Sequence, residues 1–345
     1  MKIGIHHRTG YYSDRWIRYC VEQGIDYKIV NCYENNIIEQ LKDCDALLWH
    51  HMHVDYRDTL FAKQLLFSLQ QAGKVVFPDF ETGWHFDDKL GQKYLFEALG
   101  QKLATTYAFY TKGEAFKWAL ETTYPKVFKL RCGAASSHVH LIRNRREAEH
   151  YIRRAFGRGF PQFDGPENFK DKLKLFIDGK ESVRGVLGAF LRIFYPEEIG
   201  RRRGPEKSYV IFQDFIPNDG YDYRIEIVGD YCIAAVRMVR KNDFRASGGH
   251  EGSFDKKYIT QDVLDFAFGV CDAMKSQSCA LDIVKHSMTG ELFLIENSYC
   301  YGLYEDEFDH GFWDRWGNLH DKPFDSRDWM IEAVIERIRE KNRQT

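Results

Sequence analysis

The segment from Gly220 to Gly249 constrains the fold most, because it predicts a β-hairpin that carries an unusual number of cations. Residues 224–228 alternate well enough to form a strand, and Gly229-Asp230 is the type of pair that closes a two-residue hairpin loop. A second strand is expected over 231–239. The cations on this background are Arg224, Arg237, Arg240, Lys241 and Arg245. Such a concentration of positive charge predicts an anionic ligand.

Two apolar runs farther along the chain each carry or end near a carboxylate. Residues 280–284 (ALDIV) contain Asp282, and residues 292–298 (LFLIENS) contain Glu296. Proteins usually hold Mg²⁺ by one or two carboxylates together with substrate phosphates. Cations on one hairpin and acids on the next therefore predict a phosphate-plus-magnesium site. Each residue taken singly is more often a solvated strand residue or an ordinary edge acid, and only the joint pattern favours nucleotide chemistry.

Length and composition limit the class of protein. A chain of 345 residues exceeds the usual size of a single core, so two or three lobes are expected. A formal net charge of −2 gives no global signature of nucleic-acid binding. The eight cysteines are scattered without a C-x-x-C pair, which favours reduced thiols. With neither a signal-peptide core nor a window long enough to span a bilayer, we expect a soluble cytoplasmic protein without a membrane or nucleic-acid partner.

The first part of the chain alternates strand and helix signals. Strands are expected over 2–6, 27–30, 46–49 and 74–77, with helices between them. This rhythm predicts a parallel sheet with right-handed crossovers. A dinucleotide-binding fold is the natural competitor, but the first turn, His6 to Gly10, lacks the glycines of G-x-G-x-x-G.

A run of histidines follows the third expected strand. His50, His51 and His53 would lie at the carboxyl end of a parallel strand, which is where ligands bind in open α/β sheets. Their spacing matches no standard zinc motif, so we favour a substrate-facing or simply polar loop over a metal site.

The segment GYDYRIEIVGDYCIAAVRMVRKNDFRASGG, followed by ALDIV and LFLIENS, resembles the C-terminal core of ATP-grasp enzymes, and most of all the RimK-like carboxylate–amine ligases. The resemblance implies an α/β fold with α+β lobes: a Rossmann-like pre-ATP-grasp domain over 1–86, a linker helix and a small lobe with an enlarged insertion over 87–212, and a C-terminal lobe over 213–345. It also implies ATP and Mg²⁺ or Mn²⁺ as cofactors.

Two lysines are assigned to the phosphates through this resemblance. The stretch DDKLGQKYLFEALG resembles the family's D-K-x-x-x-K helix, whose first lysine, here Lys89, approaches the nucleotide phosphates. The expected strand over 126–130 carries Lys129, which would contact the α- and β-phosphates. The small-residue loop after it, with Ser136 and Ser137, would cover the phosphates with backbone N–H groups. No Walker-type P-loop is present.

The apolar run from Tyr209 to Pro217 has two interpretations. It is either an ordinary core strand or, by the resemblance, the hinge where adenine binds. The hinge interpretation assigns Gln213, Asp214, Phe215 and Ile216 to adenine and Asp219 to the ribose. The family commonly has glutamate where Gln213 or Asp214 stands.

The resemblance also assigns metal ligands and catalytic cations. Asp282 and Glu296 would bind magnesium. The family usually reads E-x-N, whereas this chain reads Glu296-Asn297-Ser298, so a bulge would have to turn Asn297 toward the metal, or Ser298 would replace it. Arg224 and Arg245 would stabilise charge on the transferring phosphoryl group, with Arg240 in support.

These residues predict an ATP-dependent carboxylate–amine ligase that acts through an acyl phosphate on small-molecule carboxylate and amine substrates. An ATP-grasp phosphotransferase acting on a small-molecule or sugar acceptor is the first alternative, and a nucleotide-binding scaffold is the second. Residues 144–207 show no catalytic pattern and would form a cap or a contact surface. The oligomeric state stays open, with a homo-oligomer as one alternative.

Overall fold

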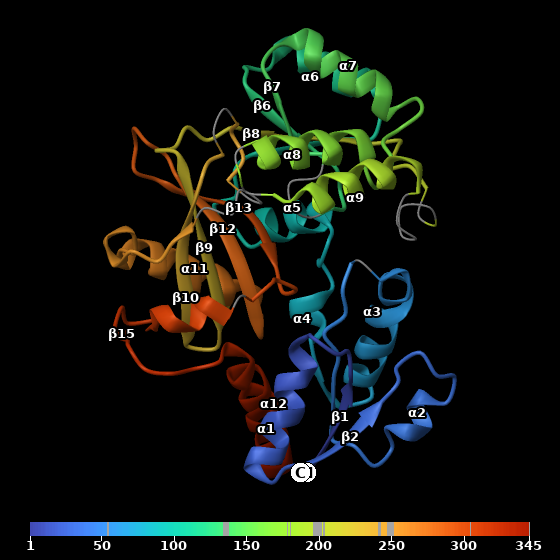
Figure 1. Cartoon of the computed structure of the whole chain (residues 1–345), viewed down its shortest axis with the longest axis vertical. Helices are drawn as coiled ribbons and strands as arrows, with labels where there is room; N and C mark the ends of the chain where they lie inside the picture. The colour runs from blue at the N-terminus through green and yellow to red at the C-terminus, as the bar shows by residue number, and fades with distance from the viewer. Residues whose placement is uncertain are drawn as a thin grey trace.

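A computed structural model describes residues 1–53, 55–133, 138–177, 179, 181–195, 202, 204–240, 243–246, 252–303 and 305–344. In this part of the chain the strands form three sheets (Figure 1). The same residues contain no helix that combines the length and the apolarity needed to cross a bilayer.

The first sheet is parallel and has the order β2-β1-β3-β4. Its strands are β1 (Lys2–His6), β2 (Asp26–Val30), β3 (Ala46–Leu48) and β4 (Val75–Phe77). The predicted parallel sheet is thus confirmed. Helices connect the strands: α1 (Tyr12–Gln23), α2 (Ile37–Gln40) and α3 (Tyr56–Gln71). β3 is buried at every position, as expected for an apolar strand covered on both faces.

The last helix of the chain packs on this first sheet. α12 (Ser326–Gln344) contacts α1 and β4, and it lies beside α1 in Figure 1. Its buried face joins one apolar cluster with the first strand and first helix: Met330, Ile331, Val334, Ile335 and Ile338 lie with Ile3, Ile5 and Trp16. The N-terminal sheet is therefore completed by residues more than 300 positions away.

A small lobe is built on the antiparallel sheet β5-β8-β6-β7. Its strands are β5 (Thr106–Phe109), β6 (Lys126–Lys129), β7 (His140–Ile142) and β8 (Val210–Asp214). α6 (Lys112–Glu121) and α7 (Arg145–Ala155) bury small and apolar residues against one face of the sheet. The opposite face of this sheet points toward the large lobe. On that side, Gln213 Nε2 lies 3.4 Å from the backbone carbonyl oxygen of Ile295 in the large lobe.

Between β7 and β8 the chain forms a helical hairpin of α8 (Gly165–Ile177) and α9 (Val183–Phe194). The helices run antiparallel: Phe169 lies 5.6 Å from Phe190 between ring centroids, and Gly165 approaches the backbone of Ile193. A Cβ at Gly165 would lie 2.9 Å from the Ile193 Cα, so glycine permits this close contact.

The large lobe is an antiparallel sheet with the order β13-β12-β9-β10-β14-β15, and β11 (Gly252–Ser253) also pairs with β10. The hairpin of β9 (Tyr221–Val228) and β10 (Tyr231–Met238) turns at Gly229-Asp230 as predicted, with Gly229 at φ +59°. The next pair is β12 (Ser278–Lys285) and β13 (Leu292–Ser298), and β14 (Phe312–Asp314) and β15 (Leu319–His320) complete the sheet. α11 (Gln261–Met274) covers one face of the sheet, and Phe96 of α5 (Lys89–Ala98) joins that core.

The remaining described elements are short: α4 (Phe80–Gly83) and the 3-10 turns η1 (Lys256–Tyr258) and η2 (Glu305–His310). We propose 1–86, 87–212 and 213–345 as divisions of the sequence. Two elements cross these divisions in the structure. Strand β8 contains residues on both sides of the boundary between 212 and 213, and α12 of the third division packs on the N-terminal sheet.

Candidate nucleotide and metal site

One face of the large sheet gathers charged side chains. Strand alternation places Tyr223, Ile225 and Ile227 of β9 in the core beneath α11, so Asp222, Arg224 and Glu226 lie on the opposite face. The pairing brings Asp282 of β12 opposite Arg224, and Arg237 of β10 opposite Asp222. The face thus combines the arginines of one hairpin with a carboxylate of the next.

Asp282 lies between two arginines. Arg224 Nη1 donates to Oδ1 of Asp282 at 2.6 Å, and Arg237 Nη2 is 2.8 Å from Oδ2. Arg237 also makes a bidentate contact with Asp222, at 2.9 and 2.7 Å. Arg224 Nε donates to Glu226 at 3.1 Å. The network holds both guanidinium groups in fixed positions on the sheet.

Burial and ion pairing act in opposite directions on these carboxylates. Burial raises the pKa of Asp282, but Arg237 and Arg224 outweigh it and lower the pKa to about 2. At Asp222 burial dominates over Arg237 and raises the pKa to about 6. Burial also raises the pKa of Glu226. The two arginines therefore keep Asp282 ionised well below neutral pH.

Glu296 lies directly opposite Asp282 on the neighbouring strand β13. Its Oε1 is 2.8 Å from Nζ of Lys89, on the first turn of α5, and the same Nζ donates to the Gly133 carbonyl at 2.9 Å. Burial alone would lower the pKa of Lys89, yet the Glu296 carboxylate leaves it above its ordinary value. The N-cap of α5 is Asp88, which accepts from Leu90 N and Gly91 N and fixes where Lys89 begins the helix.

Lys129 reaches the same place from β6 of the small lobe. Its side chain is buried, with 6% of the residue exposed, and the described residues give its Nζ no hydrogen-bond or ion-pair partner. Burial lowers the pKa of Lys129 to about 8; Glu296 and Asp282 oppose this shift, while Lys89 adds to it. A buried lysine between two acids and a second lysine is placed to receive a further anion.

A bulge in β13 decides where Asn297 and Ser298 point. The register shifts between Asp282 and Ile283, so Leu294 and Asn297 lie on the same, core-facing side. Asn297 is buried, and its Nδ2 donates to Met274 Sδ on α11 at 3.4 Å. Ser298 is partly exposed. A bulge is thus present, but it places Asn297 away from Glu296, which leaves Ser298 as the candidate third ligand.

The expected hinge lies between the two lobes. Gln213 is buried and contacts Thr106 and Ile295, whereas Asp214 accepts from Lys126 Nζ at 2.6 Å. Phe215 and Ile216 are partly exposed, and Asp219 is exposed beyond them. The residues assigned to adenine and ribose therefore follow one another from the end of β8 in the small lobe toward β9 in the large lobe.

Arg240 and Arg245 form a second group, around an acid from the inserted hairpin. Each lies 3.3 Å from a different carboxylate oxygen of Asp171 on α8, and Arg245 also contacts Asp243 at 2.8 Å. Their backbones are joined by a hydrogen bond of 3.0 Å from Arg240 N to Arg245 O. Ser136 and Ser137, as well as Lys241, lie outside the described residues.

The histidine run is more buried than a polar loop would be. His50 is 7% exposed and His51 is 2% exposed, and the ring of His50 stacks on Tyr12 at 3.8 Å. Burial, with a smaller contribution from Arg8, lowers the pKa of His50 to about 3. These two residues therefore do not form a simply polar loop, and the substrate-facing alternative stays a prediction. Within the described residues no group of three or more His, Cys, Asp or Glu side chains is placed to hold a metal ion.

The sequence reasoning assigned no role to Asp222 or Glu226, and it counted Arg237 only among the cations expected to face an anion. The signal was available, because a two-residue turn at Gly229-Asp230 fixes the hairpin register and places Arg237 opposite Asp222 on the Arg224 face. Arg237 also positions Asp282. This contact could have been inferred from the sequence only if the pairing of β9 with β12 had been known as well.

Comparison with known proteins places part of this arrangement beside a known family. A family model described as the RimK-like ATP-grasp domain matches residues 201–305, which include β9, β10, β12 and β13. Over these residues the chain is similar to that domain. The residues that form the charged sheet face lie inside the matched segment, while Lys89 and Lys129 precede it.

Solved structures extend the likeness over the whole chain. A RimK-domain ATP-grasp protein from Sphaerobacter thermophilus DSM 20745 has a TM-score of 0.52 and 13% identity, over 88% of this chain and 92% of that one. D-alanine–D-alanine ligase from Bacillus anthracis has a TM-score of 0.52 and 15% identity, over 100% and 99%. D-cycloserine synthetase DcsG has a TM-score of 0.57 and 10% identity, over 98% and 100%. These matches confirm the predicted ATP-grasp fold. No curated protein matches the chain by sequence.

Arg237 offers a test of the network that is independent of turnover. We expect Arg237→Met to lower the free energy of unfolding by about 2 kcal/mol, because Asp222 and Asp282 lose a partner within a largely desolvated network. Arg315→Met is the matched control, since that arginine contacts the more exposed Asp230 and Asp272 and should cost less than about 1 kcal/mol. Urea unfolding at pH 7 measures both, and equal losses would contradict the assigned role.

Proposed function

We propose that this protein is an ATP-dependent carboxylate–amine ligase that forms an amide or peptide bond through an acyl phosphate. The observation that carries the proposal is the opposition of Asp282 and Glu296 on one sheet face, with Lys89, Lys129 and Arg224 around them. Two carboxylates placed close together among several cations are better suited to binding a metal–triphosphate complex than to pairing with each other.

The structural relatives support a ligase in particular. D-alanine–D-alanine ligase joins two amino acids by its printed name, and the ATP-grasp ligase PsnB has been solved with a precursor peptide. PsnB has a TM-score of 0.54 over 97% of this chain. For the present chain we propose small-molecule carboxylate and amine substrates. Reduced cysteines and ATP dependence lead us to propose the cytoplasm as the place of reaction.

ATP would bind across the cleft between the small and large lobes. We assign adenine to the hinge of Gln213, Asp214, Phe215 and Ile216, and the ribose to Asp219. Lys89 and Lys129 would contact the phosphates, which the loop containing Ser136 and Ser137 would cover. The buried position of Lys129, without a hydrogen-bond or ion-pair partner among the described residues, supports the proposal that it accepts an anion.

The residues present fit a magnesium ion. Asp282 and Glu296 supply oxygen ligands from adjacent strands, and their side chains retain 17% and 31% exposure. Ser298 would be a third, weaker ligand. Mg²⁺ or Mn²⁺ bound there with ATP would neutralise charge on the phosphates.

In the proposed reaction an oxygen of the substrate carboxylate attacks the γ-phosphorus of ATP, and ADP leaves. The amine nitrogen then attacks the acyl carbon, phosphate leaves, and the nitrogen loses a proton. No side-chain nucleophile is needed. Arg224 would stabilise negative charge on the transferring group, and Arg245 and Arg240 would assist once a phosphate displaces Asp171 from them.

The acyl phosphate provides the deciding experiment. The protein is first screened for ADP release with amino acids, amines and sugar acids in the presence of ATP and Mg²⁺. With an active acid, hydroxylamine should yield the corresponding hydroxamate in proportion to ADP. A phosphotransferase would instead accumulate a stable phosphoester. A phosphoester without hydroxamate would overturn the ligase proposal and leave the nucleotide assignments in place.

A further inference from the structure

One carboxylate of the α8–α9 hairpin contacts the two arginines that follow β10. Oδ2 of Asp171 lies 3.3 Å from Nη1 of Arg240, and Oδ1 lies 3.3 Å from Nη2 of Arg245. A single anionic group therefore bridges two guanidinium groups, each through a separate oxygen. A phosphate presents its oxygens in a similar way and carries more charge, so the place that Asp171 occupies also suits a phosphate.

The turn that carries the arginines is organised by contacts of its own. The backbone N of Arg240 donates to the carbonyl of Arg245 at 3.0 Å. The carboxylate of Asp243 accepts from the backbone N of Phe244 at 2.7 Å and from that of Arg245 at 3.2 Å. The ring of Phe244 lies 6.4 Å from that of Phe215 in the proposed hinge. The turn thus keeps its place beside the hinge without help from the hairpin.

The hairpin is attached to the rest of the protein by few contacts. α8 and α9 contact each other far more than either contacts any other described element. Among the residues of α9, all of which the structure describes, Ala189 alone is buried, whereas Leu187, Phe190 and Phe194 are exposed. Segments with few buried apolar contacts move away from a protein at a low cost in free energy. The hairpin meets this description.

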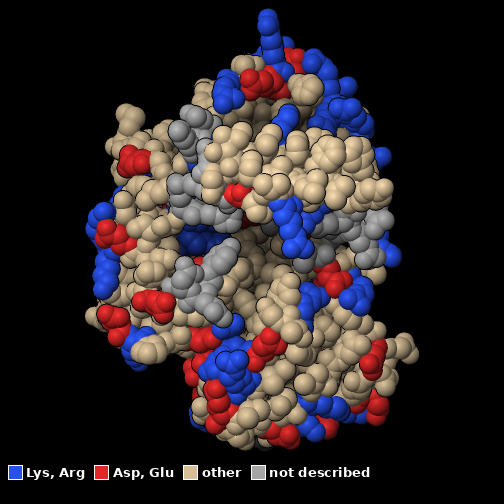
Figure 2. Space-filling view, viewed as in Figure 1, with Lys and Arg blue, Asp and Glu red and all other residues tan. Residues whose placement is uncertain are grey.

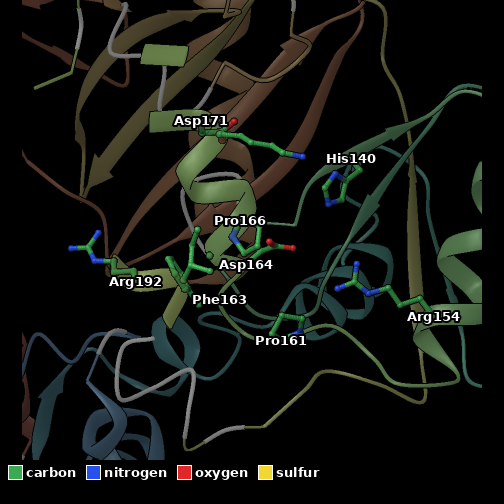
Figure 3. A pocket seen from close by; sticks show the side chains of 11 residues that line it. His140, Arg154, Pro161, Phe163, Asp164, Pro166, Asp171 and Arg192 are labelled. Atoms are coloured by element: carbon green, nitrogen blue, oxygen red, sulfur yellow. The ribbon is translucent and has the colours of Figure 1, made fainter. Parts of the chain in front are cut away.

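A cavity lies beneath the hairpin in place of a packed core. It has a volume of about 780 Å³ and separates α8 and α9 from the small lobe. Figure 3 shows Asp171 and Arg192 on the hairpin side of this cavity, and His140 and Arg154 on the small-lobe side. In Figure 2 the two helices form a largely uncharged outer layer, and Lys and Arg side chains lie in a hollow at their lower left.

The ion pairs of Asp171 are weak enough for a ligand to displace. At 3.3 Å they are longer than the 2.6 Å contact between Arg224 and Asp282, and 31% of the Asp171 side chain is exposed. Long pairs that water reaches contribute little, whereas a triphosphate brings several charges at once. Within the described residues these two pairs are also the ion pairs that join the hairpin to the large lobe.

We propose that Asp171 holds the place of a phosphate on Arg240 and Arg245, so that the α8–α9 hairpin is a strap which nucleotide releases. This regulation rests on the proposed function, which assigns both arginines to the transferring phosphoryl group. The phosphates of ATP displace the carboxylate, and the hairpin moves away from the arginines. The strap therefore covers these cations until nucleotide is present. Of the two roles expected for residues 144–207, this one is the cap.

Calorimetric titration of the full chain with ATP and Mg²⁺ tests the strap. Asp171→Asn removes the competing charge and keeps the size of the side chain, so it should bind ATP roughly three- to tenfold more tightly than the wild type. A carboxylate that only positioned the arginines would give the opposite sign. Glu181→Gln is the matched control. It removes a negative charge from the same hairpin, but Glu181 pairs with Lys172 inside the hairpin, so affinity should stay within about twofold.

Two further measurements show whether the effect acts through the arginines and the hairpin. In an Arg240→Met/Arg245→Met background, Asp171→Asn should change ATP affinity by less than about twofold, because no contact is left to release. Hydrogen exchange should become faster in α8 and α9 of the wild type when ATP is added, and Asp171→Asn should show the faster exchange without ATP. Thermal denaturation checks that each variant is folded.

Unchanged or weaker ATP binding in Asp171→Asn would overturn the strap and leave the nucleotide site in place, since the wild type would still bind ATP. Equal tightening in Glu181→Gln would also overturn it, because total charge would then explain the gain. Slower exchange in the hairpin on addition of ATP would have the same meaning. A wild-type protein that binds no ATP in the presence of Mg²⁺ would instead contradict the proposed function, and the strap would fall with it.

Discussion

Replacing Glu296 by glutamine will reduce ATP-dependent turnover by roughly 10³-fold, because the site loses one of the two carboxylates that we propose as metal ligands, at the point where charge would develop on the phosphates. The substitution keeps the size and hydrogen-bonding reach of the side chain, so the β12–β13 pair should stay intact. ADP release with an active substrate measures the effect. Manganese electron paramagnetic resonance in the presence of ATP measures metal affinity separately, and both quantities should fall.

Glu291→Gln is the control for this experiment. Glu291 directly precedes β13 and pairs on the surface with Lys102 at 2.7 Å, so its replacement removes a carboxylate next to the same strand without touching the site. Its turnover should remain within twofold of the wild type. If Glu296→Gln retained a third or more of the wild-type rate, Glu296 would have no role as a metal ligand.

Replacing Lys129 by methionine will weaken ATP binding by roughly 10- to 100-fold, the range expected when a phosphate loses a charge-assisted hydrogen bond. Methionine fills a similar volume without a buried charge, so the fold should be retained. Isothermal titration calorimetry with ATP and Mg²⁺ measures the change. Lys102→Met, at an exposed pair, should bind ATP as the wild type does, and an unchanged affinity in Lys129→Met would remove Lys129 from the site.

The pKa of Lys129 gives this prediction a pH dependence. Burial lowers that pKa to about 8, whereas a bound phosphate would raise it again. Protonated Lys129 binds the anion better, so wild-type affinity should be constant below about pH 7.5 and fall as pH rises through 8 toward 9.5. Lys129→Met should lose this decline. A variant that kept the same decline would show that another group titrates.

Much of the large lobe could be predicted because short stretches of the sequence determine its strands and turns. The turn at Gly229-Asp230 and the alternation on either side fix the β9–β10 pair, and LFLIENS gives the bounds of β13. The position of Lys129 in a strand followed from the sequence, whereas Lys89 was placed on its helix through the family resemblance. The resemblance then supplied the relation between these separate segments, which no local pattern contains.

Other features depend on contacts between distant segments. The bulge that orients Asn297 arises from pairing with β12, where the register shifts after Asp282. The contact of Asp171 with Arg240 and Arg245 requires the inserted hairpin to reach the large lobe, 69 and 74 positions along the chain. Helical spacing in α9 was readable from the sequence, but spacing alone does not say whether an apolar face is buried or exposed.

The packing of α12 against the first strand and helix has a consequence for biosynthesis. Ile3, Ile5 and Trp16 are synthesised more than 300 residues before their apolar partners Ile331 and Ile335. During translation one face of the N-terminal sheet therefore remains uncovered until α12 has been synthesised, although the lobes that follow can already form their own cores. A chain that stops before α12 would keep the residues proposed to bind nucleotide but would leave the apolar face of its N-terminal sheet exposed to water.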